Sequence, residues 1–250
     1  MKLLNMMLTL MVLSLLTTSC GSGKSGEADT AVCVWNKVSL RTEPNESSKW
    51  ITAINLGEKV TYLNESATDS SGKKPVEYYK VGLQDGKEGW VRADFIVLNS
   101  QPAVLIYSAP LYNRPDLLTK SDKNFLPMDI VAVKNGDHEG WIEVTGKSNE
   151  GKWIDKGWIK PENLSYVDVD MAVAVFAKAA IDEKNDEKKL TMLREIANNS
   201  DLSNSAFMDH IYEMISYLDG GEEEYYEAET EDETAVVASE SDSSEVYVVD

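Results

Sequence analysis

The sequence is poor in the residues that build metal sites and disulfide frameworks. Its 250 residues include two cysteines, Cys20 and Cys33, and two histidines, His138 and His210. Two cysteines cannot form a framework, and the four residues lack the spacing of a zinc site. A catalytic thiol or serine would need a histidine partner, and neither histidine lies in a recognisable signature. We therefore expect no metal, no cofactor and no catalytic residues, in a protein that is not an enzyme.

Basic residues are missing from the C-terminal part of the chain. All 24 Lys and Arg lie in residues 1–194, whereas residues 195–250 hold 17 acids and account for most of the net charge of −19. A nucleic-acid binder would need a basic stripe, and none is present, so we exclude nucleic acid as a partner. The acidic residues crowd into positions 220–250, for which the composition predicts a disordered acidic tail.

The chain also lacks an apolar run long enough to cross a membrane comfortably. Leu3 to Leu16 is apolar apart from three polar residues. A span of about 14 residues is too short for a ~30 Å hydrocarbon core and is typical of a secretory signal. The small residue Ser19 precedes Cys20, and the Gly- and Ser-rich stretch after it predicts a flexible tether.

This arrangement resembles the signal peptide of bacterial lipoproteins, in which the cysteine is acylated and becomes the first residue of the mature protein. The resemblance implies a signal peptide over residues 1–19, lipidation at Cys20 and a tether over residues 20–31. Thr17 departs from the family pattern, which prefers Leu at that place. An ordinary cleaved signal with an incidental cysteine is the alternative. The expected location is outside the cytoplasm, anchored by lipid to a bacterial membrane, with the outer membrane favoured over the inner.

Turn-forming residues are plentiful between residues 32 and 98. Five short apolar runs alternate there with turn residues every 8–12 positions or so, a pattern typical of a small all-β barrel. The clearest piece is residues 77–91, EYYKVGLQDGKEGWV, in which two short strands flank the Asp85-Gly86 step of a hairpin. Residues 66–75 are expected to form a long polar loop.

The segments LRTEP, LGEKVTYL, YYKV and DGKEGWV follow one another in the order seen in bacterial SH3-like (SH3b) domains. The resemblance covers residues 34–97 and implies a small barrel. Better-known members of the family bind extended peptides, including peptidoglycan stems, in aromatic-lined grooves. We therefore expect Trp50, Tyr62 and Tyr78 to be exposed candidates for ligand binding. The alternative is that each is a half-buried strand aromatic.

Three further residues of this segment have expected structural roles. Side-chain alternation places Val81 in the core and Tyr78 on the opposite face of the same strand. Gly89 is expected to let the backbone pass close to the neighbouring strand beneath Trp90. Cys33 lies in an apolar run, where a free cysteine usually behaves as a small buried hydrophobe.

Similar sequence segments recur later in the chain. Gly157-Trp158 follows Gly89-Trp90 by 68 residues, residues 141–144 match residues 78–81, and Pro110 aligns with Pro44 at an interval of 66. A repeat of this length predicts a second, diverged SH3-like domain over residues 99–167, in tandem with a first over residues 32–98.

The apolar period becomes helical at Asp168. Residues 168–219 are predicted to form three short amphipathic helices, the first two capped at Asp168 and Asp186 and the third starting near Ser203. The fold class is therefore mainly β with α: two tandem small SH3-like β-barrels, a short α-helical segment and a disordered acidic tail.

These features favour a lipid-anchored cell-envelope binding protein whose SH3-like modules recognise a peptide or peptidoglycan-type ligand. The alternative is a structural or adaptor lipoprotein that docks an envelope protein or partner complex through its helical segment and acidic tail. An envelope hydrolase is the least favoured class, because the helical segment is too short for a known peptidase fold.

Overall fold

The computed structural model describes residues 29–134, 138–148 and 151–220. The predicted signal peptide, Cys20 and almost the whole acidic tail lie outside the described residues. Residues 29–31 were expected in the tether, but they form the start of the first strand. Among the helices that the structure describes, none has the length and apolar character needed to cross a bilayer.

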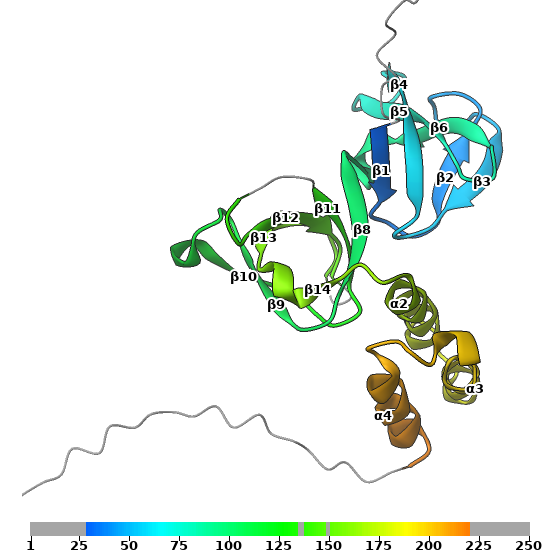
Figure 1. The fold of residues 1–250 in the computed structure, drawn as a ribbon. Helices are drawn as coiled ribbons and strands as arrows, with labels where there is room; N and C mark the ends of the chain where they lie inside the picture. Colours follow the sequence, from blue (N-terminus) through cyan, green and yellow to red (C-terminus); the bar gives the residue numbers. More distant parts are fainter. Residues whose placement is uncertain (1–28, 135–137, 149–150, 221–250) are drawn as a thin grey trace, which may run out of the picture.

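Residues 29–98 form the first unit, a curled antiparallel sheet of seven strands (Figure 1). The expected hairpin around Asp85-Gly86 is confirmed: Leu83 N donates to Lys87 O at 2.8 Å, and Gly86 has a φ of +82°. The strands lie in the order β3-β2-β6-β5-β4-β1-β7. They are β1 (Asp29–Cys33), β2 (Val38–Arg41), β3 (Trp50–Ile54), β4 (Lys59–Asp69), β5 (Val76–Gly82), β6 (Glu88–Arg92) and β7 (Ile96–Leu98), with the 3-10 turn η1 (Ala93–Phe95) before β7.

Residues 100–165 form the second unit, also a curled antiparallel sheet of seven strands (Figure 1). Its order, β10-β9-β13-β12-β11-β8-β14, is that of the first unit with every strand moved on by seven. The strands are β8 (Ser100–Leu105), β9 (Ala109–Tyr112), β10 (Lys120–Phe125), β11 (Ile130–Lys134), β12 (Ile142–Gly146), β13 (Asp155–Ile159) and β14 (Leu164–Ser165), with the 3-10 turns η2 (Leu117–Thr119) and η3 (Pro161–Asn163).

The two units also share the turn that precedes β4 and β11. In the first unit Gly57 has a φ of +79° and its N–H donates to Cys33 O at 2.8 Å. In the second unit Met128 has a φ of +66° and its N–H donates to Leu105 O at 2.9 Å. Residues of the two units can therefore be paired position by position.

This pairing corrects one part of the sequence alignment. Arg41 lies opposite Trp90, and Tyr112 lies opposite Trp158. Tyr112 is therefore the equivalent of Arg41, 71 residues later, and the alignment of the two prolines at an interval of 66 is wrong. The reason is that Pro110 lies within β9, whereas the earlier proline lies in the loop after β2.

The Gly-Trp strand of each unit crosses its neighbour with no room for a side chain. A Cβ on Gly89 would lie 2.6 Å from the carbonyl oxygen of Arg41, and a Cβ on Gly157 would lie 2.6 Å from that of Tyr112. The expected close approach at Gly89 is confirmed, and the second unit repeats it.

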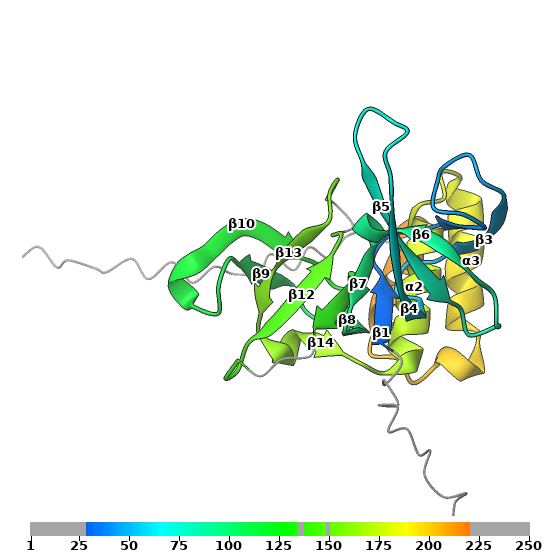
Figure 2. The ribbon, with the colours of Figure 1, turned by 90° about the horizontal axis from the view of Figure 1, so that it is seen from above.

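The connection between β4 and β5 differs from the expected long loop. β4 continues to Asp69 and pairs with β5, so that the loop shrinks to residues 70–75 at the tip of a projecting hairpin (Figure 2). The register shifts between Tyr62 and Ser66, where Asn64 has a φ of +60°. Polar residues therefore pair as strands here because a bulge adjusts the register.

Each unit has its own apolar core, and the two units pack directly on each other. A small cluster of Val32, Val34 and Ala132 joins them, and the single residue Asn99, with a φ of +54°, links β7 to β8. The first core contains Ala31, Cys33, Val38, Leu40, Ile54, Val60, Val81, Val91 and Ile96; the second contains Ala103, Leu105, Ala109, Leu111, Phe125, Val131, Val133, Val144, Ile159 and Leu164.

Three helices follow the second unit: α2 (Asp168–Ile181), α3 (Asp186–Ala197) and α4 (Met208–Leu218), with the 3-10 turn η4 (Ser200–Leu202) before α4 (Figure 1). Their apolar faces form one cluster that includes Ile130 of the second unit and touches Leu56 of the first. The first two predicted caps are displaced by one residue, because Val167 precedes α2 and the Asn185 side chain caps α3, and the third helix begins at Met208 rather than near Ser203.

One buried carboxylate ties the helices to the second unit. Asp170 on α2 is 4% exposed and accepts from the Ser165 hydroxyl at 2.6 Å, the Ser205 hydroxyl at 2.9 Å and the Ala206 N–H at 2.8 Å. Ser165 ends β14, whereas Ser205 lies just before α4. A single side chain therefore holds three segments together through charge-assisted hydrogen bonds.

We expect alanine at either Gly89 or Gly157 to lower the free energy of unfolding by about 1–3 kcal/mol, because the new methyl group meets a backbone carbonyl that cannot move away. Urea denaturation of the two variants measures this. The control is Gly72→Ala, where the nearest atom would be 3.7 Å from the Cβ. Equal stabilities for all three variants would contradict the shared close approach.

Asp170→Ala should lower the free energy of unfolding by about 3 kcal/mol, since two hydroxyls and an amide lose a charged acceptor in a buried place. The matched control is Asp168→Ala, an exposed acid in the same helical turn, which should change it by less than about 0.5 kcal/mol. Urea titration followed by helical circular dichroism distinguishes the two. Similar losses in both variants would show that the Asp170 carboxylate does not hold the three segments together.

Candidate functional site

The three aromatic candidates do not form one exposed face. Trp50 is 56% exposed, whereas Tyr62 is half-buried and packs on Tyr79 with ring centroids 5.2 Å apart. Tyr78 is 2% exposed, so its expected exposure is wrong. Alternation placed Tyr78 correctly on the face opposite Val81, but neighbouring segments cover that face as well.

Tyr78 lies in the wall of a pocket of about 340 Å³ on the first unit, which we call the Tyr78 pocket. Trp50 and Tyr62 are not among its lining residues. Besides the tyrosine, the wall includes the rings of Trp35 and Phe95, whose centroids are 5.7 Å apart, and the charged residues Lys37, Arg41, Glu46 and Arg92. The pocket combines apolar walls with few charged groups, as ligand sites usually do.

Arg92 contributes most of the polar geometry of the pocket wall. It ends β6 directly opposite Tyr78 on β5. One terminal nitrogen donates to Asp94 at 2.7 Å, the other lies 3.6 Å from Glu46, and the guanidinium group sits 5.3 Å from the Phe95 ring centroid. The remaining nitrogen, Nε, is buried and has no hydrogen-bond partner.

The Tyr78 hydroxyl is also buried without a hydrogen-bond partner. Burial raises the pKa of this hydroxyl above its ordinary value, and the Glu46 carboxylate raises it further against the opposing effect of Arg92. The group is therefore a neutral O–H at physiological pH, able to donate one hydrogen bond and to accept others.

The equivalent position in the second unit carries two aromatic rings and a lysine that contact one another. Register pairing equates Arg41, Tyr78 and Arg92 with Tyr112, Trp141 and Lys160. The Tyr112 and Trp141 rings meet edge to face with centroids 4.8 Å apart, and the Lys160 ammonium lies 3.9 Å from the Trp141 centroid. Here the aromatic and cationic groups satisfy one another.

The second unit also contacts a residue of the pocket wall. The ammonium group of Lys147, which follows β12, lies 5.2 Å from the centroid of the Trp35 ring. A positive charge of the second unit therefore lies beside one of the aromatic rings that line the pocket.

Cys33 is the buried core residue that the sequence predicts. It is fully buried, and its Sγ donates to Trp35 O at 3.1 Å. Burial raises the pKa of the thiol to about 12. At neutral pH the thiolate is absent, so Cys33 does not provide a nucleophile.

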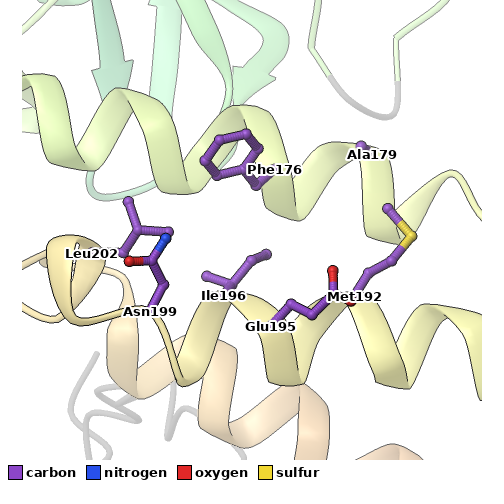
Figure 3. A pocket seen from close by; sticks show the side chains of 7 residues that line it. All are labelled: Phe176, Ala179, Met192, Glu195, Ile196, Asn199 and Leu202. Carbon is purple, nitrogen blue, oxygen red and sulfur yellow. The ribbon is translucent and has the colours of Figure 1, made fainter.

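The helices form a second concavity, a groove of about 230 Å³ between α2 and α3 (Figure 3). Phe176 of α2 and Met192 and Ile196 of α3 face one another across it. Phe176 is 48% exposed. The groove offers an apolar contact surface on the helical segment, which the alternative function assigns to partner docking.

Sequence reasoning missed the charged residues of the pocket. The hairpin supplied part of the signal: the observed loop is centred on Asp85 and places residue 78 opposite residue 92, whereas a two-residue turn at Asp85-Gly86 would place it opposite residue 93. By contrast, Lys147 could not be found, because its contact with Trp35 depends on how the two units pack.

Residues 36–97 match the sequence model of the bacterial SH3 domain. The match covers nearly the whole of the first unit and every lining residue of the Tyr78 pocket except Trp35. No curated protein matches the chain.

Two solved structures show a weak likeness. NlpC2 from Trichomonas vaginalis has 12% sequence identity and a TM-score of 0.23, over 68% of this chain and 56% of that one. NlpC1 from the same organism has 12% identity and a TM-score of 0.24, over 66% and 57%. The chain thus spans a little over half the length of either structure, and similarity at this level does not establish a shared fold.

Proposed function

We propose that this chain is a lipid-anchored binding protein of the bacterial cell envelope, whose SH3-like units recognise a peptide or peptidoglycan-type ligand. The observation that carries the proposal is the Tyr78 pocket, because it lies within the segment that matches the bacterial SH3 domain. The second unit is, in this proposal, a diverged tandem copy. Its identical strand order and its Gly157 close approach support that assignment.

The anchor is proposed from the sequence of the N-terminal segment. An apolar run, a small residue and Cys20 are followed by a Gly- and Ser-rich stretch. Each buried methylene of an acyl chain contributes about 0.8 kcal/mol, so several chains on one cysteine hold a protein firmly at a membrane. A protein exported and anchored in this way would present both units to the envelope.

Cys20→Ala should move the protein from the membrane fraction to the soluble fraction, because the acylated side chain is lost. Cell fractionation with mass spectrometry of the mature N-terminus measures the change. Cys33→Ala is the matched control and should stay at the membrane, since that thiol is buried in the first core. An unmodified N-terminus in the wild-type chain would count against the anchor.

A second candidate function is that of an adaptor lipoprotein that docks an envelope protein through the helices. The groove between α2 and α3 and the half-exposed Phe176 favour it. In this reading the two sheet units would serve as spacers and the Tyr78 pocket would have no ligand.

Binding to the cell wall separates the two functions. The full chain, held in detergent, should be retained on purified insoluble peptidoglycan. Arg92→Ala should weaken retention at least tenfold, because one hydrogen bond to a charged group contributes about 1.5–3 kcal/mol and every 1.4 kcal/mol is about tenfold. Lys160→Ala is the matched control in the second unit and should have no effect.

Two results would favour the adaptor instead. One is the absence of wild-type retention on peptidoglycan. The other is crosslinking of an envelope protein that disappears in Phe176→Ser and persists in Arg92→Ala, because such a partner would depend on the helical groove alone.

A further inference from the structure

Two buried side-chain nitrogen or oxygen atoms lack a hydrogen-bond partner in the part of the chain that the structure describes, and both belong to residues that line the Tyr78 pocket. They are the Tyr78 hydroxyl oxygen and Arg92 Nε, on residues that lie opposite each other on neighbouring strands. A buried polar group left unsatisfied costs about 1–3 kcal/mol, so such groups call for an explanation. Two of them at one place indicate a missing acceptor.

The chemistry of the two groups specifies that acceptor. Arg92 Nε can only donate, and the neutral Tyr78 hydroxyl donates as well. A ligand oxygen brought within reach of either atom would accept a hydrogen bond that the free protein leaves unmade. Peptide carbonyls and carboxylates both offer such an oxygen, and the charge beside the pocket distinguishes the two.

Positive charge exceeds negative charge around the pocket. Lys37, Arg41 and Arg92 line it against the single acid Glu46, and Lys147 stands over Trp35. Asp94 offsets part of the Arg92 charge at 2.7 Å. On a chain with a net charge of −19, this small cationic surface matches one negative charge better than a phosphate dianion, which Glu46 and Asp94 would repel more strongly.

The second unit differs from the first at the equivalent position. Tyr112, Trp141 and Lys160 contact one another there. In the first unit, Tyr78 and Arg92 each carry a buried donor without a partner. These unpaired donors place the ligand site in the first unit.

We propose that the Tyr78 pocket accepts a free carboxylate of a peptide-type ligand, with Arg92 Nε and the Tyr78 hydroxyl donating to its oxygens and Lys147 of the second unit adding charge beside Trp35. The proposal rests on the envelope-binding function proposed above and names the group that this site recognises. It also assigns recognition to the first unit alone.

The test compares purified peptidoglycan with the same material after its free carboxyl groups have been converted to primary amides. Retention of the full chain should fall at least tenfold on amidation. Equal retention on both materials would overturn the carboxylate proposal while leaving the envelope-binding function intact. Retention on neither would reject both.

Tyr78→Phe provides the second measurement. Because the hydroxyl has no partner in the free protein, its removal should leave the melting temperature unchanged or slightly higher, yet retention on untreated peptidoglycan should fall several-fold. Tyr79→Phe, the same change on the half-buried neighbour that packs on Tyr62, should keep full retention. Loss of melting temperature with retention unaffected would assign Tyr78 a structural role only.

A competition arm distinguishes the sources of the anion. Acetate should reduce retention at concentrations where inorganic phosphate at equal ionic strength does not. Displacement by phosphate alone would overturn the proposal in favour of a phosphate-bearing envelope polymer. If Tyr78→Phe and amidation both leave retention unchanged, the unpartnered atoms are satisfied by an ordered water and the proposal fails.

Discussion

The geometry of the first unit depends on the absence of a side chain at Gly89. With a Cβ position 2.6 Å from the Arg41 carbonyl oxygen, β6 can lie against β2 only because nothing projects there. This close approach accompanies the β2–β6 pairing that sets Arg41 opposite Trp90, and the hairpin from β5 to β6 sets Tyr78 opposite Arg92. The Tyr78 pocket is thus a consequence of a backbone constraint, and its charged residues sit on strands whose positions that constraint determines.

Local sequence signals were sufficient for the backbone elements of the first unit. The Asp85-Gly86 turn, the crossing at Gly89 and the core position of Cys33 each depend on residues close in sequence or on a property of a single residue type. The same kind of signal located the three helices. This local signal did not predict the extent of β4. A bulge beside Asn64 allows polar residues to continue a strand that alternation alone would end.

The errors came from contacts between segments distant in sequence. Tyr78 was assigned to the correct face of β5, but whether that face is exposed depends on Glu46 and Arg92, which neighbouring elements bring over it. Asp170 was not singled out, although its carboxylate serves Ser165 and Ser205 across three segments. A sequence shows local preference, and only the packed chain shows which groups it leaves buried or paired.

The two units differ in how the polar and aromatic side chains at this position are paired. In the second unit an aromatic pair and a lysine complete one another, so the position contributes to the stability of the unit. In the first unit an arginine and a tyrosine keep unsatisfied donors, which costs stability unless something else is bound. A single residue, Asn99, connects the two units along the chain, and an apolar cluster packs between them. These two restraints hold the second unit where Lys147 lies beside Trp35. The second unit therefore acts as a neighbour that sets a positive charge beside a wall residue of the Tyr78 pocket, and in this way it bears on recognition by the first unit.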